Sequence, residues 1–367
     1  MIILIRSNDA NPDPRLQKYI NYLEETEQSF KVIAWNRGNG MLSKENYIYF
    51  NHAAAFGLGI RNIPKKLMWF QFIIKQLWKN KNQYKVIHAC DLDTAIPAYF
   101  VKSLLNKKII FDVFDWISSE SNKSLFGKVI STIENRIFKK SDFTIICEEY
   151  RINQVSENAR RQSEILPNIP DIRLQEDVYV VSKISHQRHR FEKIISYVGV
   201  FDINRGIEHL LQNIANNSNV CLNIAGFGSL ENEVKYYAEQ YDNIIYWGKV
   251  DYNTGLNIMN NSDIIAAFYY LSNPVHSFAA PNKYYEGLFL GKAILTNEGT
   301  KLAEKIKKAN TGYVIEEGLS AIGQFLNLPL DVQEIEMKNS NSKKLWEEVY
   351  QSYTASFMKN KYQKMLD

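Results

Sequence analysis

The sequence predicts an α/β protein built from two successive domains, each a parallel sheet with crossover helices. Short β-rich runs alternate with longer helical patterns along the chain, which is typical of strand–helix–strand units. The chain has 367 residues, too many for one typical core and suitable for two domains of roughly 150–200 residues each. The alternation is interrupted once, at the polar, basic and poorly periodic segment Val181–Glu192, where we place the linker.

The first series of elements predicts a domain over residues 1–180. Its strands are expected at Ile2–Arg6, Phe30–Ala34, Val86–Ala89, Lys108–Val113 and Phe143–Cys147. Its helices are expected at Pro14–Glu25, Pro64–Lys79, Thr94–Leu105 and Leu125–Lys139. The two prolines of Ile165–Asp171 suit an extended exit from the sheet.

The second series predicts a domain over residues 193–341. Its strands are expected at Ile194–Val198, Val220–Ala225, Ile244–Trp247, Ile264–Phe268 and Ala293–Thr296. Its helices are expected at Gly206–Ile214, Leu230–Glu239, Tyr252–Met259 and Asn282–Phe289. The two series predict two Rossmann-like domains facing each other across a cleft. The tail, residues 342–367, is expected to form closing helices that pack back on the first domain.

Bulk composition excludes several classes of protein. Hydrophobic residues make up 45% of the chain and charged residues 23%, which excludes wholesale disorder. A net charge of +4 is too mild for a dedicated nucleic-acid binder. Three widely spaced cysteines without metal-ligand spacing indicate reduced thiols, and no apolar stretch approaches the ~20 residues that span a bilayer. We therefore expect a cytoplasmic protein, with peripheral attachment to the inner face of the membrane as a further hypothesis.

The segment Ala280–Leu295 (APNKYYEGLFLGKAIL) carries the strongest local signal. Pro281 suits a helix start, and Asn282 and Lys283 then lie in the first turn, where free backbone N–H groups favour phosphate. Glu286 follows Lys283 by three residues, hence on the same helix face, and is placed to accept hydrogen bonds from ribose hydroxyls. Taken alone, the Lys–Glu pair fits an ordinary surface helix better.

Two glycine-containing turns add to this signal. A predicted strand ends at Gly199, and Arg205 then opens a helix; a second strand runs into Gly226-Phe-Gly228. Neither turn is a G-x-G-x-x-G fingerprint, and a lone G-x-G is weak evidence. Three such strand–helix turns in one open sheet converge at the carboxyl edge of the strands, where ligands bind. Together they predict a diphosphate site.

The ordered set of segments resembles the family-four retaining glycosyltransferases of bacterial surface-polysaccharide type, which have the GT-B fold. The resemblance covers roughly residues 1 to 320. It rests in the second half on Tyr197–Gly206, Ile224–Gly228, Trp247-Gly248, Ser262–Ala267 and Pro281–Leu295, and in the first half on YKVIHACDLDTAIPA, KKIIFDVFDW, DFTIICEEYR and ILPNIPD.

The resemblance assigns roles to individual residues. Glu286 matches the second glutamate of the family's E-x7-E motif, which holds the donor ribose, but Phe278 occupies the position of the first glutamate. Arg205 matches the lysine of a G-R-x4-K-G pattern and should bind the diphosphate, whereas Val200 replaces the pattern's arginine; Lys283 is expected to supply the missing charge.

In the first domain, Phe114 takes the place of the family's histidine, and Asp112 and Asp115 remain as polar candidates. We expect catalytic roles for Arg205, Lys283, Asp112 and His88, the last on the acceptor side. Donor binding is expected from Gly199, Gly226, Gly228, Asn282 and Glu286, together with Arg205 and Lys283.

The resemblance implies transfer, with retention, of a sugar from a UDP- or GDP-sugar to a glycan or polyprenyl-diphosphate-linked acceptor. No metal ion and no other cofactor is implied. The leaving diphosphate can itself take the acceptor's proton while cations and helix ends stabilise its charge. Two alternatives remain: a nucleotide-sugar epimerase, and an inactive homologue that serves as a scaffold, which the changes at Phe278 and Phe114 favour.

The segment His88-Ala-Cys90-Asp91-Leu-Asp93 has two interpretations. Asp-x-Asp resembles the metal site of GT-A glycosyltransferases, and histidine, cysteine and aspartate are common metal ligands. The other interpretation is that Asp91 or Asp93 caps the helix that contains Pro97, and we favour it.

The segment Pro64–Lys85 is unusually basic and aromatic. From Asn46 to Cys90 there is no acidic residue, and PKKLMWFQFIIKQLWKNK combines lysines with two tryptophans. Such a helix fits an interfacial anchor on anionic lipid. A core-packed helix with a solvated lysine face is nearly as good an interpretation, and the lack of acidic residues tips the balance towards the membrane.

Overall fold

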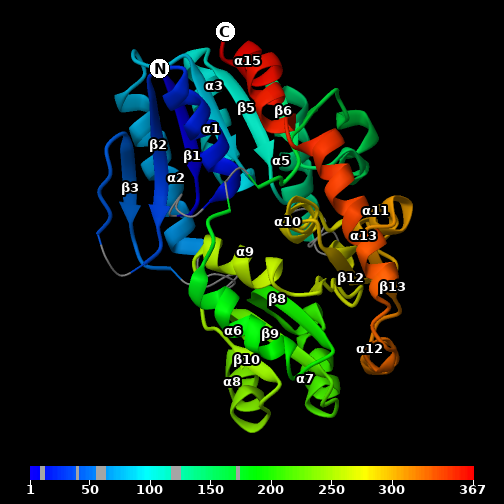
Figure 1. Cartoon of the computed structure of the whole chain (residues 1–367). Helices are drawn as coiled ribbons and strands as arrows, with labels where there is room; N and C mark the ends of the chain where they lie inside the picture. Colours follow the sequence, from blue (N-terminus) through cyan, green and yellow to red (C-terminus); the bar gives the residue numbers. More distant parts are fainter. Residues whose placement is uncertain (9–12, 39–40, 55–62, 117–124, 171–173) are drawn as a thin grey trace. The chain divides into compact units, whose positions relative to one another are not determined.

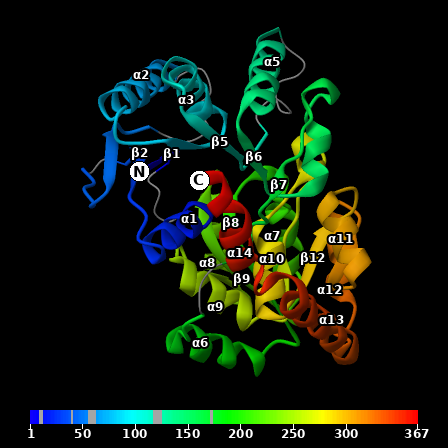
Figure 2. The ribbon, with the colours of Figure 1, turned by 90° about the horizontal axis from the view of Figure 1, so that it is seen from above.

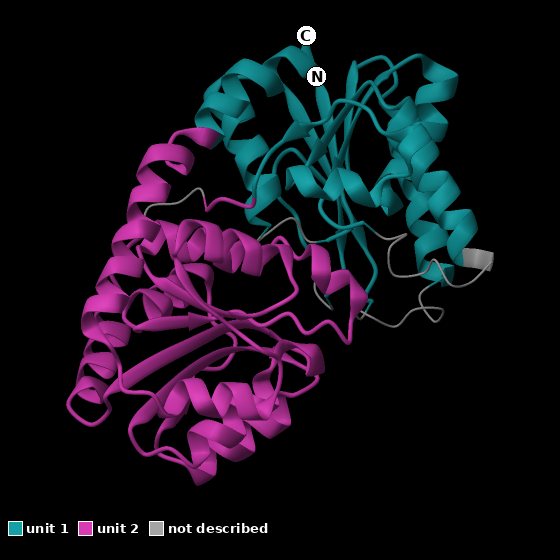
Figure 3. Cartoon of the chain, turned by 90° about the vertical axis from the view of Figure 1, so that its right-hand side faces the viewer, with its two compact units in different colours: residues 1–167, 354–367 teal, residues 168–353 magenta. Residues whose placement is uncertain are grey.

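The computed structural model describes residues 1–8, 13–38, 41–54, 63–116, 125–170 and 174–367, and all statements below concern these residues. The chain forms two compact units (Figure 3). Unit 1 comprises residues 1–167 and 354–367, and unit 2 comprises residues 168–353. Each unit contains one parallel sheet, which confirms the predicted fold class. Asp171, at the end of the predicted extended exit, lies outside the described residues.

The sheet of unit 1 has the strand order β3-β2-β1-β4-β5-β6-β7 (Figure 1). β1 and β5 have the predicted bounds, and the edge strands β3 and β7 were not predicted from the sequence. The strands are β1 Ile2–Arg6, β2 Phe30–Asn36, β3 Tyr47–Asn51, β4 Val86–Cys90, β5 Lys108–Val113, β6 Phe143–Ile146 and β7 Glu164–Ile165.

Helices cover both faces of this sheet. Figure 2 shows α2 Ile63–Lys79, α3 Leu92–Leu105 and α5 Leu125–Lys140 along one face, and α1 Pro14–Glu25 with the C-terminal helices on the other. Short 3₁₀ turns follow β6 at Glu149–Gln154 and Glu157–Ala159. The face under α2, α3 and α5 buries alternate strand residues such as Ile87 and Ala89, so their neighbour His88 points to the α1 face.

The sheet of unit 2 has the order β10-β9-β8-β11-β12-β13. Its strands are β8 Lys193–Phe201, β9 Val220–Gly228, β10 Ile244–Tyr246, β11 Ile264–Ala266, β12 Ala293–Asn297 and β13 Gly312–Ile315. Its α-helices are α6 Val178–Arg188, α7 Ile207–Ala215, α8 Glu231–Gln240, α9 Tyr252–Asn260, α10 Asn282–Leu290, α11 Lys301–Ala309, α12 Leu319–Asn327 and α13 Val332–Leu345. Two 3₁₀ turns, Ile203–Arg205 and Pro274–Phe278, precede α7 and α10. All strand pairs are parallel, so the carboxyl ends of these strands share one edge.

Two predicted boundaries are wrong. The segment Val181–Glu192 is not a linker, because most of it belongs to α6, a helix capped by the Asp177 carboxylate and buried in unit 2 through Val180 and Ile184. The two chain crossings between the units fall instead at residues 167/168 and 353/354.

The terminal helices also begin earlier than residue 342, because α13 starts at Val332 and packs within unit 2. Only residues 354–367 belong to unit 1. The chain passes from a π-helical turn, Trp346–Tyr350, into α14 Tyr353–Phe357. A second π-helical turn, Met358–Tyr362, and α15 Gln363–Leu366 follow. Among the described helices, none is both long and apolar enough to cross a bilayer.

Candidate functional site

The carboxyl ends of β8 and β9 approach each other closely because both carry glycine. Gly199 pairs with Gly226, and Phe201 pairs with Gly228. All three glycines have positive φ, between +146° and +154°, which side chains rarely tolerate. A Cβ atom at Gly226 would lie 1.8 Å from the Gly199 carbonyl oxygen, and one at Gly199 would lie 2.5 Å from Nζ of Lys283. The glycines therefore bring the backbone of β8 within reach of a cation from α10.

Arg205 ends the short turn between β8 and α7. Its guanidinium carbon lies 4.2 Å from the ring centre of Tyr269, which follows β11. Within the described part of the chain, no carboxylate forms an ion pair with it. Nearby His276 is buried, and burial and the Arg205 charge both lower its pKa. The guanidinium is thus positioned by an aromatic face and keeps its N–H donors for a ligand.

Lys283 lies in the first turn of α10. Its Nζ is 4.9 Å from the ring centre of Tyr197, and no described carboxylate lies within ion-pair distance of it. The pKa of Lys283 is lowered to about 8, chiefly by burial, with the Glu286 carboxylate opposing the shift and the Arg205 charge adding to it. The backbone N–H groups of Asn282 and Lys283 have no intrahelical acceptor, and they carry the positive end of the helix dipole. The exposed side chain of Asn282 forms no cap.

Glu286 lies one turn further along α10 and is 6% exposed. Its Oε1 accepts a hydrogen bond of 3.1 Å from the Tyr252 hydroxyl. Burial raises the pKa of the Glu286 carboxyl, and the Lys283 ammonium opposes this. Its second oxygen has no hydrogen bond to a described residue and can accept one from a ligand hydroxyl.

One edge of the unit 2 sheet therefore collects every second-domain residue that the sequence analysis selects: Gly199, Arg205, Gly226, Gly228, Asn282, Lys283 and Glu286. Two cations without carboxylate partners, a helix N-terminus and close backbone approach suit a diphosphate. Tyr197, Tyr269 and Tyr252, which contact Lys283, Arg205 and Glu286, were not predicted from the sequence. Tyr252 begins α9 and Tyr269 follows β11, positions that could have indicated them, whereas Tyr197 lies within β8.

The positions that depart from the family pattern lie on different elements of the chain. Val200 is 52% exposed on β8, directly after Gly199. Phe278 ends the 3₁₀ turn that contains His276, just before α10. In unit 1, the Phe114 ring is stacked against two guanidinium groups, with the Arg6 and Arg15 carbons 4.2 and 5.0 Å from its centre.

Asp112 is fully buried in unit 1, and its carboxylate oxygens already have partners. Arg15 donates two hydrogen bonds to it, of 2.7 and 3.1 Å, and the Tyr19 hydroxyl donates a third of 2.7 Å. Burial alone would raise the pKa of Asp112, but Arg15 and His88 together outweigh it, and the pKa lies well below its usual value. Asp112 is thus the centre of an internal ion pair.

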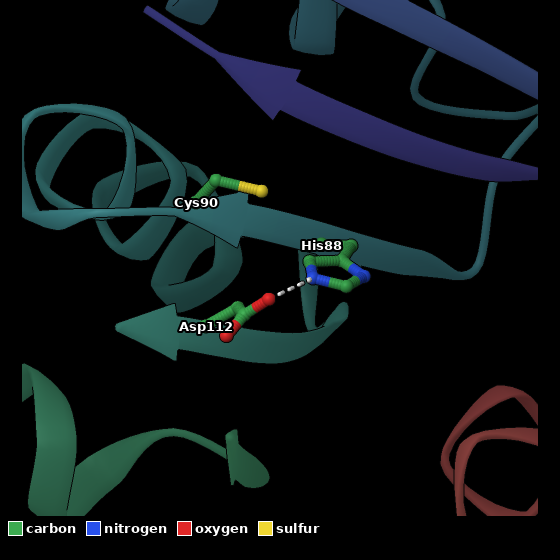
Figure 4. Close-up of side chains that lie close together, drawn as sticks. All are labelled: His88, Cys90 and Asp112. Carbon is green, nitrogen blue, oxygen red and sulfur yellow. Dashed lines mark ion pairs between the residues drawn. The ribbon is translucent and has the colours of Figure 1, made fainter. Parts of the chain in front are cut away.

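His88 is equally buried. Its Nε2 lies 3.6 Å from Asp112 (Figure 4), and its Nδ1 lies 2.9 Å from the hydroxyl of Tyr362, which comes from the C-terminal segment. His88 and Asp112 were expected to be catalytic, with His88 on the acceptor side. The structure corrects their placement, because neither is exposed and both hold elements of unit 1 together. Asp115 is exposed and pairs with Arg151 at 3.2 Å.

His88, Cys90 and Asp112 lie close enough for one ligand atom from each to fall within 4.8 Å of the others. A cation there would compete with Arg15 for the Asp112 carboxylate, and burial raises the pKa of the Cys90 thiol well above its usual value. Both effects oppose metal binding.

Asp91 does not cap α3 with its side chain as expected. Although it occupies the N-cap position, no backbone N–H of the helix donates to its carboxylate. The carboxylate instead pairs with Arg6 and accepts hydrogen bonds from the backbone N–H groups of Phe114 and Asp115. Asp93 lies in the first turn of α3, where a negative charge suits the helix dipole.

Helix α2 has both a buried and an exposed apolar side. Trp69, Ile73 and Leu77 are buried, whereas Leu67 and Trp78 are 56% and 46% exposed. Lysines 65, 66, 75 and 79 are exposed as well. Core packing therefore accounts for one side of α2 only.

A family model matches part of unit 2. Residues 182–331 match the family described as "Glycosyl transferases group 1". This stretch contains all seven residues collected at the carboxyl edge of the unit 2 sheet.

Comparison with individual proteins extends the similarity to most of the chain. An uncharacterized 41.2 kDa protein in the cps region of Klebsiella pneumoniae is 25% identical over 343 residues, covering 88% of this chain and 86% of that protein. Sucrose-phosphate synthase from Thermosynechococcus elongatus has a TM-score of 0.75 at 14% identity and covers 99% and 98% of the two chains. Anabaena Alr3699/HepE in complex with UDP-glucose has a TM-score of 0.70 at 12% identity and covers 99% of each chain. These structures share the fold, and they confirm the prediction of two Rossmann-like units of the GT-B class.

Proposed function

We propose that the donor of this chain is a UDP- or GDP-sugar bound at the carboxyl edge of the unit 2 sheet. The chain is a glycosyltransferase, because unit 2 carries a group 1 glycosyltransferase domain. The observation that carries the proposal is the pair Arg205 and Lys283. Both cations lie beside the glycine ends of β8 and β9, and neither is paired with a described carboxylate. The Anabaena structure with UDP-glucose supports a nucleotide-sugar donor.

The acceptor in this proposal is a glycan or a polyprenyl-diphosphate-linked glycan used to build a surface polysaccharide, and transfer proceeds with retention. The similarity to a protein of a cps region supports this assignment. The two cations and the N-terminus of α10 would bind the diphosphate and stabilise its charge as the bond to the sugar breaks. Glu286 would hold the ribose.

The direct test is a thermal-shift screen against UDP, GDP, ADP and their sugar conjugates. A ligand at 100 times its Kd should add about 2.7 kcal/mol of stability, which is readily detected. A uridine or guanosine diphosphate sugar should stabilise the protein, and a sugar transfer assay with the stabilising donor follows. Absence of any nucleotide response would contradict the proposal.

Glu286→Ala should weaken donor binding by about 1–3 kcal/mol, because charge-assisted hydrogen bonds to the ribose are lost. Isothermal calorimetry with the stabilising donor measures the change. Glu239→Ala, an exposed glutamate on α8, is the matched control and should bind normally. If Glu286→Ala binds the donor as the wild type does, Glu286 is not part of the site.

Chelation should leave transfer essentially intact, because the proposed chemistry uses Arg205 and Lys283 in place of a metal ion. The measurement is the transfer rate before and after EDTA treatment, with manganese and magnesium added back in separate samples. Loss of activity with rescue by either ion would reverse this expectation.

We propose further that α2 attaches the enzyme to anionic membrane. Each lysine near such a surface contributes about 1 kcal/mol, and the exposed Leu67 and Trp78 can add a salt-resistant part. Replacing Lys65, Lys66, Lys75 and Lys79 by Gln should reduce cosedimentation with anionic vesicles and leave donor affinity unchanged.

The matched control for this prediction changes Lys308, Lys343, Lys344 and Lys359, which are also exposed, to Gln and so has the same net charge. It should sediment as the wild type does. A wild-type protein that ignores anionic vesicles even at low salt would show that α2 is not an anchor.

A further inference from the structure

Two hollows flank the outer side of α5 in unit 1. The first, of about 310 Å³, lies between α3 and α5, and its lining is almost entirely apolar, including Phe100 and Leu104 from α3 and Ile133 and Ile137 from α5. The second, of about 390 Å³, lies on the other side of α5, towards the 3₁₀ turn Glu157–Ala159. Its lining is polar and basic. The same helix therefore separates an apolar hollow from a cationic one.

Arg136 lines both hollows. It is exposed and has no ion pair or hydrogen bond to a described residue, and the same holds for the ammonium group of Lys140 in the second hollow. Lys139, also in the second hollow, donates to the Asn158 carbonyl. The only acid within α5, Glu134, is fully buried, so the exposed side chains that α5 contributes to the second hollow include cations and no carboxylate. Glu157 lies nearby and does not line the hollow.

The apolar side chains here are exposed to an unusual degree. Phe100, Leu104 and Val129 are 55%, 58% and 56% exposed. Helices α3 and α2 pack side by side in one layer (Figure 2). Leu67 and Trp78 of α2 are exposed as well. Residues 63–85, 92–108 and 125–142 together carry 13 basic and 3 acidic side chains. Exposed apolar side chains bordered by cations fit a lipid surface. The apolar hollow, in which four aliphatic side chains accompany Tyr99 and Phe100, suits an acyl chain, whereas a nucleic-acid site would rely on stacking aromatic groups and phosphate contacts.

We infer that the outer side of α5 binds an anionic phospholipid of the bilayer, with part of an acyl chain in the apolar hollow and the phosphate at Arg136 and Lys140. The chain is bound by burial of methylene groups, and the phosphate is bound by charge-assisted hydrogen bonds. This site lies on α3 and α5, so it is separate from the α2 lysines and does not depend on the assignment of the donor.

The first arm of the test measures vesicle binding. Vesicles of phosphatidylcholine are compared with vesicles that also contain phosphatidic acid. Each removed charge should lower the affinity for anionic vesicles about fivefold, so the double variant R136Q/K140Q should bind them roughly 25-fold more weakly. The matched control K343Q/K344Q removes two exposed charges from α13 in unit 2 and should bind normally. Equal binding of the two variants overturns the site.

The second arm uses soluble ligands, so that bilayer attachment through α2 does not contribute. Calorimetry compares a short-chain phosphatidic acid with inorganic phosphate. Ser103 is an exposed lining residue of the apolar hollow, and Ser103→Trp should fill this hollow without changing charge.

The wild type should bind the short-chain lipid at least tenfold more tightly than inorganic phosphate, and Ser103→Trp should lose this preference. The variant with four α2 lysines replaced should keep it. Equal affinity for lipid and phosphate in the wild type, or an undiminished preference in Ser103→Trp, overturns the inference and leaves the donor proposal untouched. Melting temperatures of all variants should match the wild type, because every replaced side chain is exposed.

Discussion

Replacing Arg205 or Lys283 by Ala should lower turnover by roughly 10²–10³, and donor affinity should fall much less. The reason is that negative charge on the leaving diphosphate is greatest in the transition state, so a cation lost there affects kcat more than ground-state binding. Steady-state kinetics and calorimetry on the same preparations separate the two effects. The matched control Arg190→Ala removes an exposed cation of unit 2 and should change neither quantity.

Lys283 adds a pH signature to this prediction. Its pKa of about 8 means that the free enzyme loses this charge as the pH rises through 8. Donor affinity should therefore decline between pH 7 and 9 in the wild type. In Lys283→Arg the charge persists, so the decline should be absent. If both alanine variants keep wild-type turnover, the diphosphate does not bind at Arg205 and Lys283.

Asp112→Ala should destabilise unit 1 by about 3–5 kcal/mol, the cost typical of breaking a buried ion pair by removing one partner. The Arg15 guanidinium, with a side chain only 5% exposed, would be left without its carboxylate, and the Tyr19 hydroxyl would lose its acceptor. Urea denaturation followed by tryptophan fluorescence measures the loss. Because Arg15 holds the pKa of Asp112 low, the ion pair should contribute throughout the neutral range and be lost only as the pH falls through that low value.

A double-mutant cycle tests whether the ion pair itself is responsible. Arg15→Met combined with Asp112→Leu replaces both charges by apolar groups and should cost clearly less than the sum of the single changes. Donor affinity should be unchanged in any variant that folds, since the donor residues belong to unit 2. Strictly additive losses would show that Arg15 and Asp112 do not depend on each other.

Periodic, buried elements could be predicted closely from the sequence. β1 and β5 have the predicted bounds because each is built on an apolar run, Ile2–Ile5 and Ile109–Phe111, as strands covered on both faces are. The prediction missed α6 for an identifiable reason. Its buried positions are Val180, Ile184 and Gln187, which have helical spacing, but the third is polar. The burial of Gln187 is possible because its side chain exchanges hydrogen bonds with Asn223 on β9. Asn223 lies 36 residues away, so a local sequence pattern cannot predict this pairing.

The gathering of the proposed donor residues at one edge of the unit 2 sheet could also be predicted, since helix starts and glycine turns are local features. The first-unit residues could not, because their partners come from distant segments. Either Asp91 or Asp93 was predicted to cap a helix, yet the partner of the Asp91 side chain is Arg6, 85 residues earlier. His88 was expected to face an acceptor, yet it bonds to Tyr362, 274 residues later. A buried polar residue pairs with whichever group the tertiary structure places beside it. The local sequence does not show which polar residues will be buried.

The discontinuity of unit 1 determines the order in which the chain can fold during synthesis. Tyr362 is fully buried against Tyr19 and His88, so the interior of unit 1 is completed only by residues 354–367. Unit 2 is one uninterrupted stretch, residues 168–353, and needs no later segment to complete its core. Unit 1 instead stays incomplete, with the polar groups of its buried network still hydrated, until residues 354–367 are available to it. The first unit therefore cannot be completed before the chain of unit 2 has been made, whereas domains usually fold in order from the N-terminus onward.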